Sequence, residues 1–172
     1  MKPRPFIMYP DPRLRSEAAP LDEIDDAARA LWDEMLAAMY AMPGVGLAAN
    51  QLGVLRRLIV LDASDTRDQA MRLANPVILH ESIEGRTHQE GSPNLPGLWA
   101  EVTRPRAVTV SYMDEEGAAA EREFVGLWAT SVQHQIDHIN GKLFVDHLSP
   151  MKRRMLVARH SKQMKQSQRK RG

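Results

Sequence analysis

The chain contains no cysteine among its 172 residues, and it holds only three residues each of Phe, Tyr and Trp. Without cysteine, disulfide frameworks, thiolate metal sites and cysteine nucleophiles are excluded. No run of about 18 apolar residues is present, and the opening MKPRPFIMYP lacks the apolar stretch of a signal peptide. The 43% hydrophobic and 26% charged residues are typical of a globular domain. We therefore expect one cytoplasmic domain with no membrane partner.

The net charge of +1 hides an uneven distribution. Nine of the 23 Lys and Arg residues lie in 151–172 and none of the 22 Asp and Glu residues do, which leaves 1–150 with 14 basic residues and a net charge of −8. Clustered positive charge attracts polyanions. We expect a domain at 1–150 and a basic helix or tail at 151–172 that binds RNA, with an ordinary solvated helix as the alternative.

Proline and apolar spacing indicate the first elements. Prolines at 10, 12 and 20 predict an extended loop over Pro10–Pro20. A helix is predicted next by apolar residues at steps of three and four, which are Ile24, Ala28, Leu31, Met35 and Met39. The acidic residues between 22 and 26 are expected in its first turn, and Pro43 with Gly44 should end it.

The rest of the chain predicts short strands and two more helices. Strand-like runs cover Arg57–Ala63, Leu73–Leu79 and Ala107–Met113, and a turn at 114–117 predicts a hairpin with a run ending at Val125. A helix is expected over Leu127–Asn140 and another from about Ser149. These elements favour an α+β domain of mostly antiparallel strands around a central helix.

His134 and His138 are four residues apart on the predicted helix, so their side chains share one face. This spacing lets two imidazoles bind one metal ion. In HExxH metallohydrolases the residue after the first histidine is a glutamate that transfers protons, whereas this chain has Gln135, which cannot ionise. Hydrogen-bonded structural histidines are the alternative to a metal site.

The segment GVGLAANQ at residues 44–51 combines glycines with small residues. Glycine permits a tight turn and close approach of a ligand to the backbone, and small residues let a buried strand lie against a helix. Gln51 is polar in an apolar segment and needs a partner. A structural turn with a satisfied glutamine is the other interpretation.

Three segments together resemble the peptide deformylase family of metallohydrolases, which remove the formyl group from N-terminal formylmethionine. GVGLAANQ matches the family's GxGLAAxQ loop, EGSPNLPG at 90–97 aligns with EGCLSxPG, and QHQIDHING at 133–141 aligns with QHExDHLxG. The opening IMYPDPRLR at 7–15 also resembles the family's start. The resemblance extends from about Phe6 to Ser149 and implies an α+β fold with the histidines on a central helix.

This chain departs from the family's motifs at three positions. The resemblance implies metal ligation at Ser92, His134 and His138, but Ser92 replaces the family's cysteine with a neutral hydroxyl. Gln135 replaces the glutamate that acts as general acid and base, a role usually worth about 10²–10⁴ in rate. Pro93 replaces the residue whose backbone N–H stabilises the oxyanion beside Gln51, and losing such a donor costs about 10²–10³ in turnover.

Four further positions bear on the site that the resemblance implies. Trp99 stands where many family members have an arginine, which is expected to reshape the substrate groove. His88 lies four residues before Ser92 and is a weak candidate for a substitute metal ligand. The resemblance implies supporting, hydrogen-bonding roles for Glu90 and Asp137.

Three functions remain in view. The first is a deformylase-like protein with lost or strongly reduced hydrolysis that still binds formyl-Met peptide ends through Val45, Gly46, Gln51 and the segment at Pro93. The second is an active metal-dependent deformylase with an altered site. The third is a ribosome- or RNA-binding module that uses the basic tail. The resemblance implies one divalent metal ion (Fe, Zn or Ni) at reduced affinity, or a remnant site that holds none.

Overall fold

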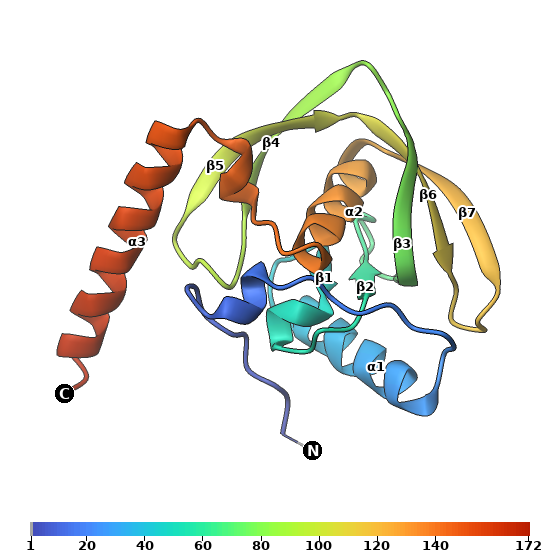
Figure 1. The fold of residues 1–172 in the computed structure, drawn as a ribbon, viewed down its shortest axis with the longest axis horizontal. Helices are drawn as coiled ribbons and strands as arrows, with labels where there is room; N and C mark the ends of the chain where they lie inside the picture. Colours follow the sequence, from blue (N-terminus) through green and yellow to red (C-terminus); the bar gives the residue numbers. More distant parts are fainter. Residues whose placement is uncertain (1) are drawn as a thin grey trace.

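A computed structural model describes residues 2–172 as three α-helices, seven strands and three short 3₁₀-helices (Figure 1). The α-helices are α1 (Asp26–Ala41), α2 (Gly126–Ile139) and α3 (Pro150–Arg169). The strands are β1 (Gly46–Ala48), β2 (Leu58–Leu61), β3 (Met71–Glu81), β4 (Gly85–Gly91), β5 (Trp99–Pro105), β6 (Ala107–Met113) and β7 (Ala119–Val125). The 3₁₀-helices cover Pro12–Arg15, Ala49–Leu52 and Phe144–His147.

The strands form two antiparallel sheets. Five strands pair in the order β1-β2-β3-β6-β7, and β4 and β5 form a separate two-stranded ribbon. The ribbon pairs Gly91 with Trp99 and Glu90 with Ala100, so the short loop 92–98 closes one of its ends. Because β1 pairs only with β2, it leaves one strand edge free beside this loop.

Helix α2 lies at the centre of the molecule, between the sheets (Figure 1). Its apolar residues Ala129, Val132, Ile136 and Ile139 pack with β2, β3, β6 and β7 in one buried cluster. Helix α1 covers β1 and β2 through a second cluster around Trp32 and Met35. A third cluster around Leu95, Leu98 and Phe144 holds the 92–98 loop against the segment after α2. The polar face of α2 therefore points into the protein.

The predicted α+β class with mostly antiparallel strands is confirmed, as are the hairpin β6–β7 and the central helix. Gly141 has a φ of 74°, the left-handed conformation expected where that helix ends.

Three local predictions were wrong. The segment predicted as an extended loop contains a 3₁₀-helix at Pro12–Arg15, which Asp11 initiates by accepting a hydrogen bond from the Arg13 N–H. Helix α1 begins at Asp26 rather than near residue 22, because the Asp25 carboxylate caps it through the Ala28 N–H. The strands β4 and β5 were not predicted, since their polar and charged residues lack the apolar alternation that indicates a strand.

Helix α3 begins at Pro150 after the N-cap Ser149 and lies at the edge of the molecule (Figure 1). Its own His160 is buried, while nearly all of its basic residues are exposed. Among the described residues, no helix combines the length and apolar character needed to cross a bilayer.

Candidate active site

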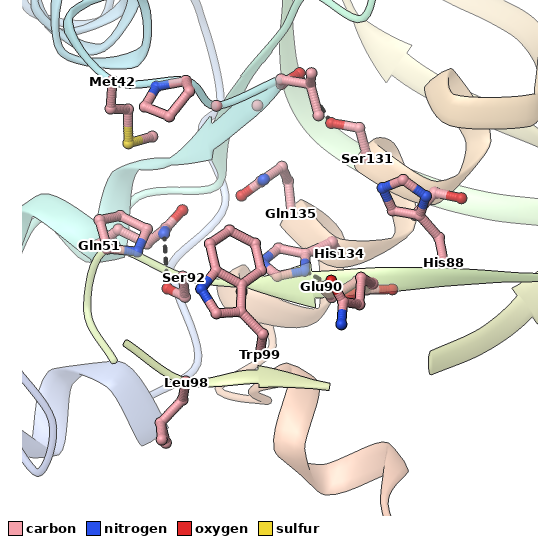
Figure 2. Close-up of a pocket in the computed structure, with 18 of the residues that line it drawn as sticks. Met42, Gln51, His88, Glu90, Ser92, Leu98, Trp99, Ser131, His134 and Gln135 are labelled. Carbon is pink, nitrogen blue, oxygen red and sulfur yellow. Dashed lines mark hydrogen bonds and ion pairs between the residues drawn. The ribbon is translucent and has the colours of Figure 1, made fainter. Parts of the chain in front are cut away.

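The polar face of α2 consists of buried side chains. Gln133, His134, Gln135 and His138 are each at most 8% exposed. Gln133 has a structural role, because its amide donates to the carbonyls of Ala129 and Pro105. His134 and Gln135 border the cavity that β1 and the 92–98 loop also line (Figure 2), and His138 contacts His134. Burying these polar groups has a cost unless they find partners, so their contacts indicate what the site can do.

The Nε2 atoms of His134 and His138 face each other at 3.1 Å. Burial, and then the neighbouring His134, hold the pKa of His138 well below its usual value, so this imidazole is neutral. Two imidazole nitrogens on one tetrahedral metal ion lie roughly 3.3 Å apart, given metal–nitrogen distances of about 2.0–2.1 Å. The pair therefore fits two positions around a single ion.

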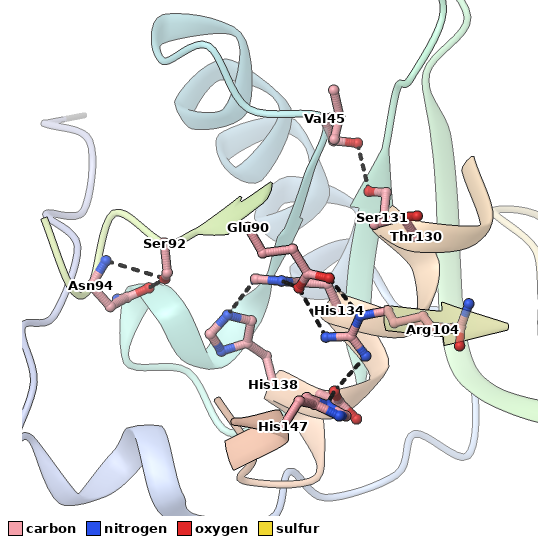
Figure 3. A network of polar contacts seen from close by, with 12 residues as sticks. Val45, Glu90, Ser92, Asn94, Arg104, Thr130, Ser131, His134, His138 and His147 are labelled. Carbon is pink, nitrogen blue, oxygen red and sulfur yellow. Dashed lines mark hydrogen bonds and ion pairs between the residues drawn. The ribbon is translucent and has the colours of Figure 1, made fainter. Parts of the chain in front are cut away.

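Glu90 orients His134 by accepting a hydrogen bond from its Nδ1 at 2.7 Å (Figure 3). The same carboxylate forms a two-point contact with the Arg104 guanidinium at 2.7 and 2.9 Å. Burial opposes ionisation of Glu90, but hydrogen bonds from His134 and Arg104 outweigh it and lower its pKa to about 2. Nδ1 of His138 has no hydrogen-bond partner within the described residues. Only one of the two imidazoles therefore has the outer hydrogen bond that fixes a metal-binding histidine.

Arg104 links the site to the end of α2. Its guanidinium also contacts Asp137 at 2.8 Å, and Asp137 in turn accepts a hydrogen bond from Nε2 of His147 at 2.7 Å. Burial acts to raise the pKa of the Asp137 carboxyl. The hydrogen bond from His147 and the charge of Arg104 outweigh this effect, so the pKa lies below its usual value. Glu90 and Asp137 thus act as supports for the helix, as the sequence predicts for both.

Ser92, at the position of the predicted third metal ligand, is engaged by neighbouring polar groups. Its Oγ donates to Oδ1 of Asn94 at 3.0 Å, and it accepts from the Gln51 amide at 3.4 Å and from the Asn94 backbone N–H at 3.3 Å. The hydroxyl proton and its lone pairs are therefore all used inside the protein (Figure 3).

Gln135 lies beside β1, where the missing side chain of Gly46 makes room for it. A Cβ at Gly46 would come within 2.5 Å of Oγ of Ser131 and 2.9 Å of Nε2 of Gln135. Oε1 of Gln135 is buried and has no hydrogen-bond partner in the part of the chain that the structure describes. An amide at this position can hold a polar atom of a ligand or a water molecule, but it cannot take up and release a proton.

These side chains border a cavity of about 370 Å³ (Figure 2). Seven of the eight predicted site residues line it, namely Val45, Gly46, Gln51, Ser92, Pro93, His134 and Gln135. His138 lies behind His134 and reaches the site through that ring. Apolar side chains form much of the wall, including Met42, Leu98, Trp99 and Leu127. The cavity suits an elongated, largely apolar ligand with a polar end near the histidines.

The described residues contain no group of three His, Cys, Asp or Glu side chains arranged to hold a metal ion. His88 lines the cavity, but it lies on the opposite side from Ser92 in the view of Figure 2. The two imidazoles fit a metal ion and the third position does not, because Ser92 is neutral and already hydrogen-bonded.

Known proteins resemble this chain in sequence and in fold. The family described as polypeptide deformylase matches residues 3–154. The chain belongs to the polypeptide deformylase family. It is 46% identical over 167 residues to the peptide deformylase of Methylocella silvestris, covering 94% of this chain and 85% of that protein. It is also 44% identical over 164 residues to the peptide deformylase of Rhizobium meliloti, covering 94% of each chain.

Solved deformylase structures share the fold. The structure from Legionella pneumophila superposes with a TM-score of 0.88 at 38% identity, covering 96% of this chain and 98% of that one. The structure from Ehrlichia chaffeensis also reaches a TM-score of 0.88 at 29% identity, covering 94% and 97%. Membership in the deformylase family is thus supported by sequence and by structure, over nearly the whole chain.

Three residues of this deformylase-family site were missed from the sequence. Arg104 is buried on β5. Val102 and Arg104 point inward on either side of the exposed Thr103, and this alternation would have indicated a buried arginine if the strand had been predicted. Asn94 donates to the carbonyl of Gln51, 43 residues earlier in the chain, and His147 contacts Asp137, ten residues earlier, and no local sequence pattern indicates either contact.

Proposed function

We propose that this deformylase-family protein binds the amino ends of formyl-Met peptides and hydrolyses the formamide bond weakly or not at all. The observation that carries the proposal is the state of Ser92, whose hydroxyl is neutral and hydrogen-bonded to Asn94 where the family's metal needs an anionic ligand.

Proton transfer is the step most clearly weakened. Hydrolysis of a formamide requires a group that takes a proton from the attacking water and gives one to the leaving amine. Gln135 occupies the corresponding place and has no titratable proton. Glu90 is the nearest carboxylate in the network, but its pKa of about 2 and its contacts with Arg104 and His134 keep it ionised and engaged. Neither residue can serve as an acid near neutral pH.

Metal binding through His134 and His138 alone is expected to be weak. A divalent ion, when bound, polarises a carbonyl and lowers the pKa of water. Two neutral imidazoles supply no negative charge, and Ser92 would first have to give up its hydrogen bonds. We therefore propose that Fe, Zn or Ni binds with reduced affinity.

Binding of a peptide end does not depend on these losses. The free edge of β1, which begins at Gly46 directly after Val45, offers an extended ligand a strand to lie along. The apolar wall of the cavity suits a methionine side chain, which is long and flexible. The peptide end would thus lie with its amino terminus towards His134.

An active, metal-dependent deformylase with an altered site is the second candidate. Two observations favour it. Many curated relatives are named peptide deformylase, including three at 44–46% identity, and the Nε2 atoms of the two histidines still converge on one point. In that case the metal would be held by two imidazoles and water.

Hydrolysis of formyl-Met-Ala-Ser separates the two candidates. The purified protein is loaded in turn with Fe²⁺, Ni²⁺ and Zn²⁺, and formate release is measured with and without a chelator. The weak-hydrolysis proposal predicts little or no chelator-sensitive release but measurable peptide binding by calorimetry. Chelator-sensitive turnover that disappears in His134→Ala would establish the active enzyme instead.

We also propose that residues 1–150 form the deformylase-like domain of a cytoplasmic protein and that α3 contacts the ribosome. The support is the exposed positive charge of α3, which together with Lys170 and Arg171 after it carries nine basic and no acidic residues. Replacing Lys162, Lys165 and Arg169 by Gln should reduce co-sedimentation with ribosomes and weaken its salt dependence. Replacing three exposed acidic residues of the domain, Asp22, Glu23 and Asp26, is the matched control. Salt-independent co-sedimentation would contradict the idea.

A further inference from the structure

A second hollow, of about 450 Å³, lies between the second half of α3 and the loop that joins β4 to β5. We call it the α3 groove. Figure 1 shows this helix alongside that loop, at the edge of the molecule. Pro96 and Gly97 line the α3 groove and also line the cavity beside the histidines. The cavity and the α3 groove therefore meet at one ridge formed by these two residues.

The ridge is low enough for a chain to cross. Pro96 and Gly97 are both exposed, and Gly97 has a φ of 80°, the left-handed conformation that favours glycine. A Cβ at Gly97 would lie 3.7 Å from Oε1 of Gln163, so an amide of α3 reaches the ridge from the groove side. With no side chain at Gly97, the backbone of an extended ligand can pass close to the loop.

The α3 residues that line the groove lie on one face of the helix. They recur at steps of two to four residues, and they are His160, Gln163, Met164, Gln166, Ser167 and Lys170. Lys162, Lys165 and Arg169 also recur at steps of three and four, but they fall on the opposite face of a helix with 3.6 residues per turn. The groove is thus separate from the basic face that we propose contacts the ribosome.

His160 is a buried polar side chain in the wall of the groove. It is 1% exposed, and its Nε2 has no hydrogen-bond partner among the described residues. Burial holds the pKa of His160 below its usual value, so the ring is neutral, with one nitrogen that donates and one that accepts. Gln163, Gln166 and Ser167 add further donors and acceptors. These groups match the N–H and C=O groups of a peptide backbone.

The charge of the groove favours acidic side chains. Lys170 lines it, and none of its lining residues within the described chain is acidic. The whole segment 151–172 carries nine basic and no acidic residues. Complementary charge speeds association and favours the matching partner. Met164 adds an adaptable apolar contact for the stems of such side chains.

We propose that the α3 groove binds the acidic residues of a peptide whose formyl-Met end occupies the cavity, with the chain crossing the ridge at Gly97. The inference rests on the proposed function, because it assumes that the amino end lies in the cavity. It adds a substrate class, namely peptides in which Asp or Glu follows a few residues after the formyl-Met end.

The test compares three peptides by calorimetry on the natural protein. They are formyl-Met-Ala-Ser, the same peptide extended by Ala-Asp-Ala-Asp-Ala-Asp, and the same peptide extended by Ala-Lys-Ala-Lys-Ala-Lys. Six further residues span up to about 20 Å when extended. The acidic extension should tighten binding about tenfold, and the basic extension should not tighten it.

Two lysines of α3 provide a matched pair of variants. Lys170→Gln and Lys165→Gln remove the same charge from exposed side chains, but only Lys170 lines the groove. Lys170→Gln should cost about two- to fivefold of the affinity gained from the acidic extension, whereas Lys165→Gln should keep the gain. Gln163→Ala should also reduce the gain. Urea denaturation should give the same midpoint for all three variants, because none of the side chains is buried.

The outcomes separate this inference from the proposed function. If formyl-Met-Ala-Ser binds and the acidic extension adds no affinity, the inference alone fails. Equal losses in Lys170→Gln and Lys165→Gln would show diffuse attraction of a basic helix for any polyanion, such as RNA, and would also overturn it. If formyl-Met-Ala-Ser does not bind, the proposed function fails. The groove is then tested with acetyl-Ala-Asp-Ala-Asp-Ala-Asp on ¹⁵N-labelled protein, where an unchanged Gln163 side-chain amide signal would overturn the groove as well.

Discussion

Nε2 of His134 and Nε2 of His138 lie 3.1 Å apart in the buried interior of the molecule, one helical turn from each other on α2. Glu90 fixes the first ring by a 2.7 Å hydrogen bond, and burial keeps the second ring neutral. The pair retains the geometry for metal binding, while the third position belongs to a hydroxyl engaged with Asn94. The histidine pair and its contact with Glu90 therefore suit metal binding, whereas Ser92 does not supply the third ligand.

Restoring the motif should create a metal site. In the triple variant Ser92→Cys, Pro93→Leu and Gln135→Glu, a thiolate joins the two imidazoles and completes a three-residue ligand set. We expect about one metal ion per chain by mass spectrometry, compared with a small fraction in the natural protein. His134→Ala in the same triple background is the control and should lose the metal. Equal metal content before and after the three changes would count against the argument from Ser92.

Removing the Glu90 charge should destabilise the fold strongly. Glu90 and Arg104 are each about 4% exposed, and Glu90→Gln leaves the guanidinium with Asp137 as its remaining carboxylate partner. Breaking one side of a buried ion pair typically costs about 3–5 kcal/mol in the free energy of unfolding, measured by urea denaturation.

The matched control for that experiment is Glu84→Gln. Glu84 pairs with Arg106 at 2.9 Å, but the two side chains are 75% and 61% exposed. Exposed pairs contribute about 0–1 kcal/mol, so this change should be nearly neutral. Similar losses in both variants would show that Glu90 has no special structural role.

Acid should weaken the support under the histidines. The pKa of Glu90 is about 2 in the folded protein, below its ordinary value of 4.5, so the unfolded chain takes up a proton first as the pH falls. The contribution of Glu90 to stability is therefore present above about pH 4.5 and declines towards pH 2. The difference in unfolding free energy between the natural protein and Glu90→Gln should shrink across this range. A difference that does not change with pH would contradict the assigned pKa.

Trp99 should report on occupation of the cavity. Its side chain is 60% exposed, lines the cavity, and lies over Gly91, where an added Cβ would come within 2.7 Å of the ring. Peptides with apolar side chains should change its fluorescence, and Trp99→Ala should weaken their binding about fivefold or more. Trp128→Phe is the control because Trp128 packs on the core instead. If Trp99→Ala and Trp128→Phe bind these peptides equally well, the peptide does not contact Trp99.

Much of the fold could be predicted from local patterns. The apolar spacing around Leu31 and Met35 predicts α1, and the alternation in Ala107–Met113 predicts β6, because each pattern reflects one buried face. The ribbon of β4 and β5 could not be predicted in this way. Its burial depends on contacts with α2 and with the segment after it, and its sequence is mostly polar.

The candidate site was predictable to the extent that it consists of contiguous motifs. The residues at 44–51, 90–97 and 133–141 line or support one cavity. The contacts that decide what Gln51 and Ser92 can do were not predictable, because they depend on Asn94 meeting Gln51 across 43 residues of sequence. Similarly, nothing local indicates that Arg104 joins Glu90 to Asp137.

The most direct test of the central claim is a combined measurement on the natural protein after loading with Fe²⁺, Ni²⁺ or Zn²⁺. Metal content is determined by mass spectrometry, and formate release is followed in a single turnover with protein in excess over formyl-Met-Ala-Ser. We predict a metal content well below one ion per chain and no formate release above the uncatalysed background. One metal ion per chain, with release at rates of about 1–10³ s⁻¹ as in ordinary enzymes, would contradict it.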